Sequence, residues 1–183
     1  MIDEKYLVLE FCNCGDLYSY FIKDRLPITT REELLEAVSL CSHIAKGMRF
    51  LEDLGFTHRD LKPENVLIQR DIHKDTLTAK IADFGLCKQS NMLKSIVGTP
   101  NYIAPEILDV ESTTDKLYTN AVDVWSFGLL LYETITKKQI FRGKTQQEIV
   151  TSIKLFSKKV NIAALEENTE ENCRINKLIG LCL

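Results

Sequence analysis

Apolar residues along the chain follow two spacings, which predict a mostly helical fold with a few short strands. Residues 30–33 read Thr-Arg-Glu-Glu and form a capping box. Apolar residues then recur every three or four positions, at Leu34, Val38, Cys41, Ala45, Met48 and Leu51. This stripe predicts a long helix that stops at Gly55, because glycine readily ends a helix. Residues 121–136 are apolar on several faces, which predicts a second helix at the centre of the fold.

Shorter apolar runs predict strands. Residues 6–11 are almost continuously apolar, with β-branched and aromatic members, which is typical of a buried strand. Residues 66–68 and 79–81 predict two more strands, joined by a polar hairpin loop over residues 69–78. A short amphipathic helix is predicted over residues 17–23.

The remaining stretches complete an α+β fold that is mainly helical and has short β-hairpins. Helical patterns surround residues 149–156 and 175–183, and the acidic run 166–171 between them predicts a solvated loop. Residues 85–99 form a long irregular stretch. Loops of that length in compact domains are usually functional.

Composition narrows the class of protein. The chain has 183 residues, of which 45% are hydrophobic and 27% charged, values typical of one folded domain or one lobe of a larger domain. The net charge of −3 gives no reason to expect a nucleic-acid partner. No run of 18 apolar residues is present, so we expect no membrane span.

The sequence also bears on the cellular compartment in which the protein is expected. Residues 1–5 include acids and lack an apolar stretch behind a basic start, which argues against a secretory signal. A cytoplasmic location is therefore expected, with the nucleus also open. The six cysteines have irregular spacing and are expected to be free thiols, as is usual in a reducing compartment.

Three short motifs carry the chemistry. Residues 58–65 read His-Arg-Asp-Leu-Lys-Pro-Glu-Asn, residues 83–85 read Asp-Phe-Gly and residues 104–106 read Ala-Pro-Glu. Each motif alone is weak evidence. Their order and separation around a predicted strand pair make chance coincidence improbable.

The residue types within these motifs suit phosphoryl transfer, which needs positioned charge more than covalent chemistry. Asp60 can orient a hydroxyl group and accept its proton. Asn65 and Asp83 offer the hard oxygen ligands that Mg²⁺ prefers, and Lys62 could neutralise charge on a phosphoryl group. A capped turn with exposed acids would explain one of these residues but not the set.

The three motifs resemble those of the eukaryotic protein kinases, serine/threonine branch. The resemblance implies ATP and Mg²⁺ as cofactors and a mainly helical large lobe as the fold. It implies that Asp60 is the catalytic base, Lys62 the phosphate contact, and Asn65 and Asp83 the metal ligands. Thr99 resembles the family threonine that hydrogen-bonds the catalytic aspartate and lysine; its alternative is an ordinary turn threonine.

The same resemblance implies a nucleotide site. The backbone of Glu10 and Cys12 is expected to hydrogen-bond the adenine edge, and Asp16 matches an acid that contacts the ribose. Leu67 is expected to form the apolar floor beneath the base. For Leu67 alone, plain core packing is the default interpretation.

Regulation and scaffold can also be inferred by resemblance. Ser95 matches the usual activation-loop phosphosite, with Ser90 as the second candidate. An upstream kinase would modify it, and Arg59 and Lys88 would then bind the phosphate. Asp123 resembles the buried acid that accepts backbone N–H groups from residues 58 and 59.

The resemblance covers residues 1–183 as a partial kinase domain, from the hinge strand to the second-last helix of the large lobe. Nothing in the sequence resembles the glycine-rich loop or the phosphate-binding lysine of the small lobe, so the domain is expected to be incomplete at both ends. We also expect Glu106 to be a buried charge without its family arginine, which would destabilise the lobe.

The expected function is transfer of the ATP γ-phosphate to serine or threonine hydroxyls of protein substrates. The alternative is a catalytically inactive kinase-like binding or regulatory module, because the glycine-rich loop and the lysine strand are missing. A third possibility is an enzyme completed by a separate chain.

Overall fold

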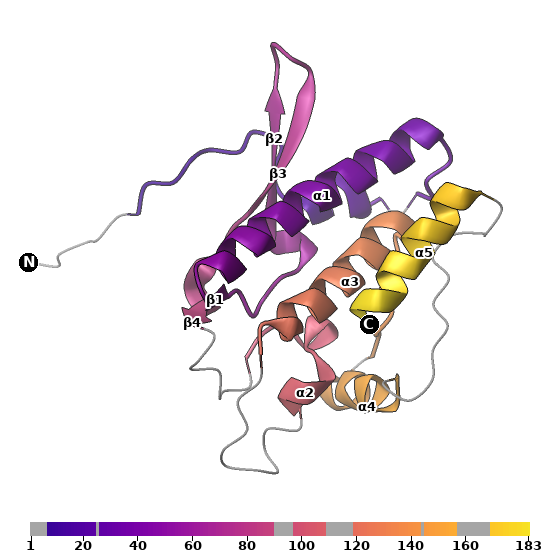
Figure 1. Ribbon diagram of the computed structural model, residues 1–183. Helices are drawn as coiled ribbons and strands as arrows, with labels where there is room; N and C mark the ends of the chain where they lie inside the picture. The colour runs from indigo at the N-terminus through magenta and orange to yellow at the C-terminus, as the bar shows by residue number, and fades with distance from the viewer. Residues whose placement is uncertain (1–6, 25, 90–96, 109–118, 144, 157–168) are drawn as a thin grey trace, which may run out of the picture.

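The computed structural model describes residues 7–24, 26–89, 97–108, 119–143, 145–156 and 169–183. Three helices lie side by side at its centre, a β-hairpin rises from one end, and two shorter helices lie at the other end (Figure 1). The α-helices are α1 (Arg31–Asp53), α2 (Pro105–Leu108), α3 (Ala121–Thr136), α4 (Gln146–Phe156) and α5 (Glu170–Cys182). The strands are β1 (Phe56–Thr57), β2 (Val66–Asp71), β3 (Thr76–Ile81) and β4 (Lys88–Gln89).

Helix α1 begins where the capping box predicts. The Thr30 hydroxyl accepts a hydrogen bond from the Glu33 N–H at 3.1 Å, and Glu33 in turn accepts from the Thr30 N–H at 3.2 Å. These bonds satisfy N–H groups that have no partner inside the helix. The helix ends at Asp53, and Gly55 follows with a φ of 75°. Both predicted ends of the long helix are therefore confirmed.

The buried face of α1 differs slightly from the predicted stripe. Ala45, a predicted member, is exposed, whereas Val38 and Met48 are only half-buried. The stripe is rotated because α3 and β3 both pack against α1, and the residues between these two neighbours are the ones covered. The buried residues of this face are Leu34, Ala37, Leu40, Cys41 and Ile44.

Helix α3 is the buried centre of the molecule, as predicted. Twelve of its residues are buried, and α1 and α5 pack on it from two sides. A Cβ atom on Gly128 would lie 2.6 Å from the Cys182 Cβ, so the absence of a side chain at Gly128 lets α5 approach closely. Trp125 faces the other way and stacks on Phe141 at a centroid distance of 6.0 Å.

Strands β2 and β3 form an antiparallel hairpin, in register from Val66 opposite Ile81 to Asp71 opposite Thr76. The hairpin loop is shorter than the predicted 69–78, because the ladder continues through polar residues that the apolar pattern does not mark. Strands β1 and β4 pair as a second small sheet, with Thr57 opposite Lys88.

The predicted strand over residues 6–11 is not formed in the described part, residues 7–11. Leu7, Val8, Leu9 and Phe11 are 71–91% exposed. A strand is stable only when a neighbour satisfies its backbone groups, and both described sheets pair other segments. The chain joins the hairpin later, where the Cys14 N–H donates to the Ile68 carbonyl at 3.0 Å.

Two further expectations need correction near the carboxyl end. Residues 170 and 171 of the predicted acidic loop lie in the first turn of α5. The positive end of the helix dipole stabilises acidic side chains there. Thr169 caps that helix by accepting from the Asn172 N–H at 3.1 Å. Glu106 is exposed rather than buried, so the argument for destabilisation by a buried unpaired charge is wrong.

Two other sequence-based expectations can be compared with the structure. All six cysteines are free thiols, as predicted. None of the helices in the described ranges is both long and apolar enough to cross a membrane.

Candidate active site

Asp123, at the start of α3, anchors the loop that carries the first motif. Its carboxylate accepts the His58 N–H at 2.7 Å and the Arg59 N–H at 2.8 Å, as the resemblance implied. Burial raises the pKa of Asp123, while the two N–H groups favour its charged form. Arg59 takes a left-handed φ of 70°, an uncommon conformation that these bonds hold in place. Asp60 follows this anchored turn directly.

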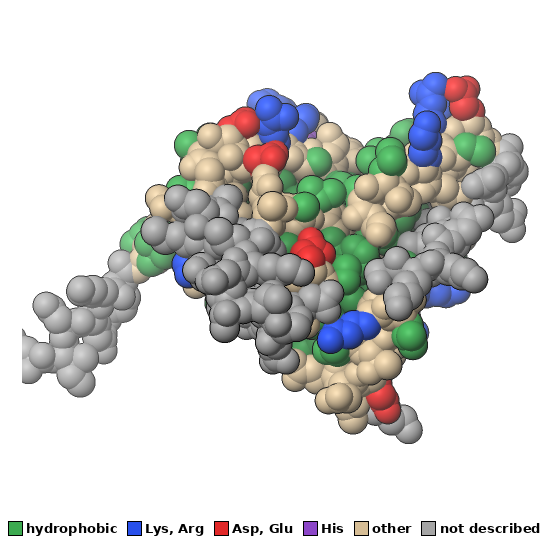
Figure 2. Space-filling view, turned by 60° about the horizontal axis from the view of Figure 1, so that its bottom comes forward, with side chains coloured by type: hydrophobic (Ala, Val, Ile, Leu, Met, Phe, Trp, Pro, Cys, Tyr) green, Lys and Arg blue, Asp and Glu red, His purple; other side chains and the backbone are tan. Residues whose placement is uncertain are grey.

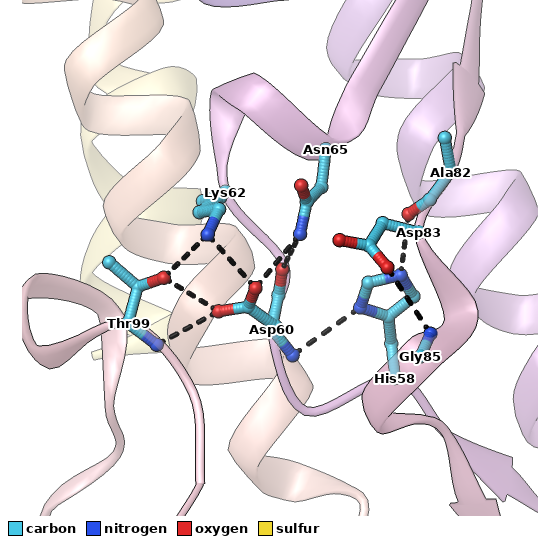
Figure 3. A network of polar contacts seen from close by, with 8 residues as sticks. All are labelled: His58, Asp60, Lys62, Asn65, Ala82, Asp83, Gly85 and Thr99. Carbon is cyan, nitrogen blue, oxygen red and sulfur yellow. Dashed lines mark hydrogen bonds and ion pairs between the residues drawn. The ribbon is translucent and has the colours of Figure 1, made fainter.

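Asp60 lies at the centre of a network of polar contacts (Figure 3). One of its oxygens, Oδ1, accepts the Thr99 hydroxyl at 2.7 Å and the Thr99 N–H at 2.8 Å. The other, Oδ2, lies 2.9 Å from the Lys62 Nζ and accepts from the Asn65 Nδ2 at 3.0 Å. Lys62 also donates to the Thr99 Oγ1 at 2.7 Å. Four predicted site residues are thus brought together.

These contacts hold the Asp60 carboxylate in its charged form. Burial would raise its pKa, but the hydrogen bonds from Thr99 and Lys62 and the charge of Lys62 outweigh burial and lower it. A carboxylate with a lowered pKa is a weak base. The geometry therefore suits a residue that orients a hydroxyl group. Such a residue receives the hydroxyl proton only late, as a phosphoryl group is transferred to the hydroxyl oxygen.

Gly98 allows Thr99 to reach Asp60. Its φ is 111°, and a Cβ atom there would lie 2.6 Å from the Arg59 carbonyl oxygen. Only a residue without a side chain fits between the two backbone segments at this separation. The sequence patterns did not predict this role of Gly98. The available signal was a glycine inside a long irregular stretch, directly before a site threonine.

Asp83 and Asn65 lie on neighbouring segments, because the Ala82 N–H donates to the Asn65 carbonyl at 2.8 Å. Asp83 is exposed, and Figure 3 shows its carboxylate turned toward the side where Asn65 and Asp60 lie. Since the Asn65 Nδ2 donates to Asp60, the amide oxygen of Asn65 faces away from Asp60.

Two oxygen donors fit Mg²⁺, which usually takes one or two protein carboxylates or amides and completes its shell with water and phosphate oxygens. Within the described ranges no cluster of three or more His, Cys, Asp or Glu side chains could hold a metal ion. The residues present therefore match a magnesium–nucleotide site better than a metal site made only of protein ligands.

His58 links the first two motifs. Its Nε2 lies 3.0 Å from the Ala82 carbonyl oxygen, and its Nδ1 accepts from the Asp60 N–H at 3.4 Å. Both contacts are satisfied by one neutral tautomer, with the proton on Nε2. The His58 ring also meets the Phe84 ring edge-on, at a centroid distance of 5.5 Å. His58 thus contacts both the segment that carries Asp83 and the backbone of Asp60.

Comparison with known proteins agrees with this geometry. Residues 2–183 match the protein kinase domain. The chain belongs to the eukaryotic protein kinase family. Human protein kinase C delta type is 41% identical over 157 residues, which cover 84% of this chain and 21% of that protein. A serine/threonine-protein kinase of Drosophila erecta is 39% identical over 128 residues, which cover 69% of this chain and 16% of that protein.

The rat protein kinase C delta type is 40% identical over the same length as the human one. These relatives place the kinase domain in the serine/threonine branch. The chain spans about a fifth of the length of the curated relatives it matches.

The residues expected around the nucleotide lie at the base of the hairpin of the kinase domain. Asp16 forms an isolated bridge with Leu67, and its carboxylate accepts the Ser19 N–H at 2.8 Å. Glu10 pairs with Lys80, which is opposite Leu67 in the ladder. Glu10, Asp16 and Leu67 therefore all lie near the Leu67–Lys80 pair of the hairpin. Cys12 is half-buried on the segment between Glu10 and Asp16.

The residues expected to bind a regulatory phosphate are only partly described. Arg59 donates from Nε to the Leu86 carbonyl at 2.6 Å, and Lys88 lies on β4 beside β1. Arg59 thus contacts the start of the stretch predicted to be irregular, residues 85–99, and Lys88 lies within that stretch. Ser90 and Ser95 lie outside the described residues, so the phosphate site stays a prediction.

Proposed function

We propose that this kinase domain takes part in transfer of the ATP γ-phosphoryl group to serine or threonine hydroxyls of proteins. The observation that carries the proposal is the Asp60 carboxylate, fixed on both oxygens by Thr99, Lys62 and Asn65. A carboxylate prearranged in this way needs little reorganisation when it meets a substrate hydroxyl.

Each residue has a chemical task in this proposal. Asp60 orients the substrate hydroxyl and receives its proton. Lys62, held between Asp60 and Thr99, presents positive charge where a transferred phosphoryl group would carry negative charge. Asn65 and Asp83 would hold Mg²⁺, which when bound neutralises charge on the nucleotide phosphates. These tasks agree with the hard oxygen donors and with the position of Lys62 at the site.

The nucleotide would bind along the base of the hairpin in this proposal. The backbone of Glu10 and Cys12 would meet the adenine edge, Asp16 the ribose, and Leu67 the underside of the base. The ion pair between Glu10 and Lys80 supports the proposal, because it ties the otherwise exposed segment to the hairpin. Protein substrates and an upstream activating kinase belong to the same proposal.

The Asp60→Asn variant tests the function. The measurement is transfer of labelled phosphate from Mg-ATP to a peptide that contains serine and threonine. The unmodified protein and the variant are expressed from the natural gene and compared. We expect the variant to lose about 10²- to 10⁴-fold in turnover, the usual contribution of a positioned acid or base. Asp71→Asn, on the exposed hairpin end, is the matched control and should keep full turnover.

Calorimetry with Mg-ATP on the same proteins distinguishes an active kinase from the alternative, a catalytically inactive kinase-like binding or regulatory module. Nucleotide binding without turnover in the unmodified protein would support a kinase-like binding module. Equal turnover in Asp60→Asn and the unmodified protein would contradict the proposed role of Asp60.

A further inference from the structure

The edge of β2 that faces the amino-terminal segment is completed by contacts from residues 13–15. In an antiparallel pair of strands, every second residue directs both its N–H and its carbonyl group toward the same neighbour. At Ile68 these two groups meet backbone groups, since the Cys14 N–H donates to the Ile68 carbonyl at 3.0 Å and the Ile68 N–H donates to the Gly15 carbonyl at 2.8 Å. Arg70 is the next residue of β2 that faces the same way.

At Arg70 a side chain takes the place of a strand backbone. The Arg70 N–H donates to the Asn13 Oδ1 at 2.8 Å, and the Asn13 Nδ2 donates to the Arg70 carbonyl at 3.1 Å. A primary amide carries a donor and an acceptor, as a peptide group does, so the Asn13 side chain satisfies both backbone groups of Arg70. The two bonds together fix the direction in which the amide faces.

These bonds secure the chain at the end of an otherwise exposed segment. Phe11 is 81% exposed, and Figure 1 shows its segment reaching the hairpin beside β2. Glu10 contacts the hairpin through its side chain, in the ion pair with Lys80. Asn13 therefore holds the last residues of the exposed segment against β2, the strand that carries Leu67.

The place of Asn13 in the chain decides what its bonds can affect. Cys12 directly precedes Asn13 and Glu10 lies three residues before it, and the backbone of Glu10 and Cys12 is proposed to meet the adenine edge. A base held between this backbone and Leu67 requires a fixed separation between the two, because a site that must first be ordered binds more weakly.

We propose that Asn13 is a positioning residue for nucleotide binding, because its side-chain amide holds the backbone of residues 10–12 at a fixed place beside β2. Asn13 acts through that backbone and through Leu67, not by touching the nucleotide itself. The inference rests on the nucleotide site of the proposed function, but it does not require phosphoryl transfer.

The Asn13→Asp variant tests this role with almost no change of shape. Aspartate keeps an acceptor for the Arg70 N–H but turns an oxygen toward the Arg70 carbonyl, where asparagine has a donor. Calorimetry on the protein expressed from its natural gene measures the affinity for adenosine and for Mg-ATP. We expect both dissociation constants to rise about tenfold, since one net hydrogen bond is worth up to that factor.

Turnover assays on the same proteins separate positioning of the nucleotide from an effect on transfer. The KM for ATP should rise by the same factor as the dissociation constant. The kcat should stay within about twofold, because binding is weakened without a change at the reacting groups. The network around Asp60 is built from Thr99, Lys62 and Asn65.

Asp75→Asn is the matched control, because it is the reverse exchange at a second side chain that contacts Arg70. The Asp75 carboxylate pairs with the Arg70 guanidinium group at 2.8 Å rather than with its backbone, and the Asp75 side chain is 82% exposed. Asp75→Asn should therefore bind adenosine as tightly as the unmodified protein. Equal adenosine affinity in Asn13→Asp and the unmodified protein would overturn the proposed role, and so would a lowered kcat with an unchanged KM.

Reciprocity supplies a second test that needs no variant. If the Asn13 bonds favour nucleotide binding, bound nucleotide must favour these bonds by the same factor. Hydrogen exchange of the Arg70 N–H in the unmodified protein should therefore slow by up to about tenfold at saturating adenosine. An exchange rate that adenosine leaves unchanged would overturn the proposal, even if Asn13→Asp does not fold.

The proposed function and the role of Asn13 can fail separately. Phosphoryl transfer by the unmodified protein, with equal adenosine affinity in Asn13→Asp, would refute the role of Asn13 alone. Weaker adenosine binding in Asn13→Asp, with full turnover in Asp60→Asn, would support the role of Asn13 and refute that of Asp60. An unmodified protein that binds neither adenosine nor Mg-ATP would refute both the nucleotide site and the role of Asn13.

Discussion

Thr99 holds the Asp60 carboxylate through two bonds, one from its hydroxyl and one from its N–H, and it also accepts from Lys62. A side chain that both donates and accepts is needed between a carboxylate and an ammonium group. Serine would meet that requirement, and valine, which has nearly the same shape as threonine, would not.

We predict that Thr99→Val lowers turnover by about tenfold to a hundredfold, on the order of 1.5–3 kcal/mol for hydrogen bonds to charged groups. Removing the hydroxyl also removes one cause of the lowered Asp60 pKa. The acid side of the pH–turnover profile should therefore move to higher pH. The lowered pKa of Asp60 lies below its ordinary value of 3.8, so peptide phosphorylation from about pH 3 to 8 measures both effects. Thr99→Ser, as control, should keep most of the turnover. An unshifted profile in Thr99→Val would argue against the network.

Lys137 makes a second residue-scale prediction, on stability. Its pKa is about 8 in the folded chain and 10.5 ordinarily, so the folded state binds fewer protons than the unfolded state between these pH values. The free energy of unfolding should therefore rise with pH across this window, by up to about 3 kcal/mol. Below pH 8 the full destabilisation is present.

Urea unfolding at pH 7.5 and pH 10 measures the effect as a difference between the unmodified chain and Lys137→Met. The difference is needed because burial raises the pKa of Cys41 to about 12, which lowers stability with rising pH in both proteins. Lys137→Met should be the more stable protein at pH 7.5, and its advantage should shrink at pH 10. A constant difference at both pH values would show that Lys137 does not titrate as described.

At the scale of elements, two backbone segments lie close together at Gly98. One is the segment before η5 (Pro100–Tyr102), and the other is the loop after β1, which contains Arg59. Gly98→Ala would place a Cβ atom 2.6 Å from the Arg59 carbonyl oxygen, at a φ of 111°. Strain of this kind costs about 1–3 kcal/mol. We predict a loss of that size in the free energy of unfolding, measured by urea denaturation, together with reduced turnover because Thr99 is displaced.

The control for this substitution is Gly180→Ala in α5. A Cβ atom at Gly180 meets nothing within 4 Å, and alanine favours a helix over glycine by up to about 1 kcal/mol. Gly180→Ala should therefore stabilise the chain slightly. A destabilising effect at Gly180, or a neutral effect at Gly98, would contradict the described packing.

At the scale of the whole molecule, several large apolar side chains near the amino end are exposed to solvent. Leu7, Val8, Leu9 and Phe11 are 71–91% exposed and lie on the segment that extends away from the folded body in Figure 1. Hydrophobic side chains also show at the left of the face in Figure 2. Contiguous exposed apolar side chains in an extended segment favour association through strand edges and apolar contact.

We predict that the chain by itself associates with increasing concentration through this segment. Replacing Leu7 and Leu9 with serine should reduce the association at least tenfold, as measured by analytical ultracentrifugation. Leu155→Ser and Leu181→Ser, at exposed positions on α4 and α5, together form the control and should reduce it less. If the two double variants associate equally, the amino-terminal segment is not the cause.

The helices could be predicted from the sequence because their signals are local. The capping residues of α1 lie within four positions of each other, and the apolar residues of α3 repeat every turn. The site residues could be named for a similar reason, since residues 58–65 and 83–85 are short motifs. The strand lengths were harder, because Gln69 and Thr78 pair across the hairpin through backbone groups that any residue carries.

The sequence by itself therefore determined the long helices α1 and α3, the family and the set of candidate site residues, because each depends on neighbours in the chain. Only the tertiary structure decided which distant groups meet. It placed Thr99 on Asp60 through Gly98, left residues 7–11 uncovered, and buried Lys137 against Phe21. These contacts depend on the packing of segments far apart in sequence, which no local pattern encodes.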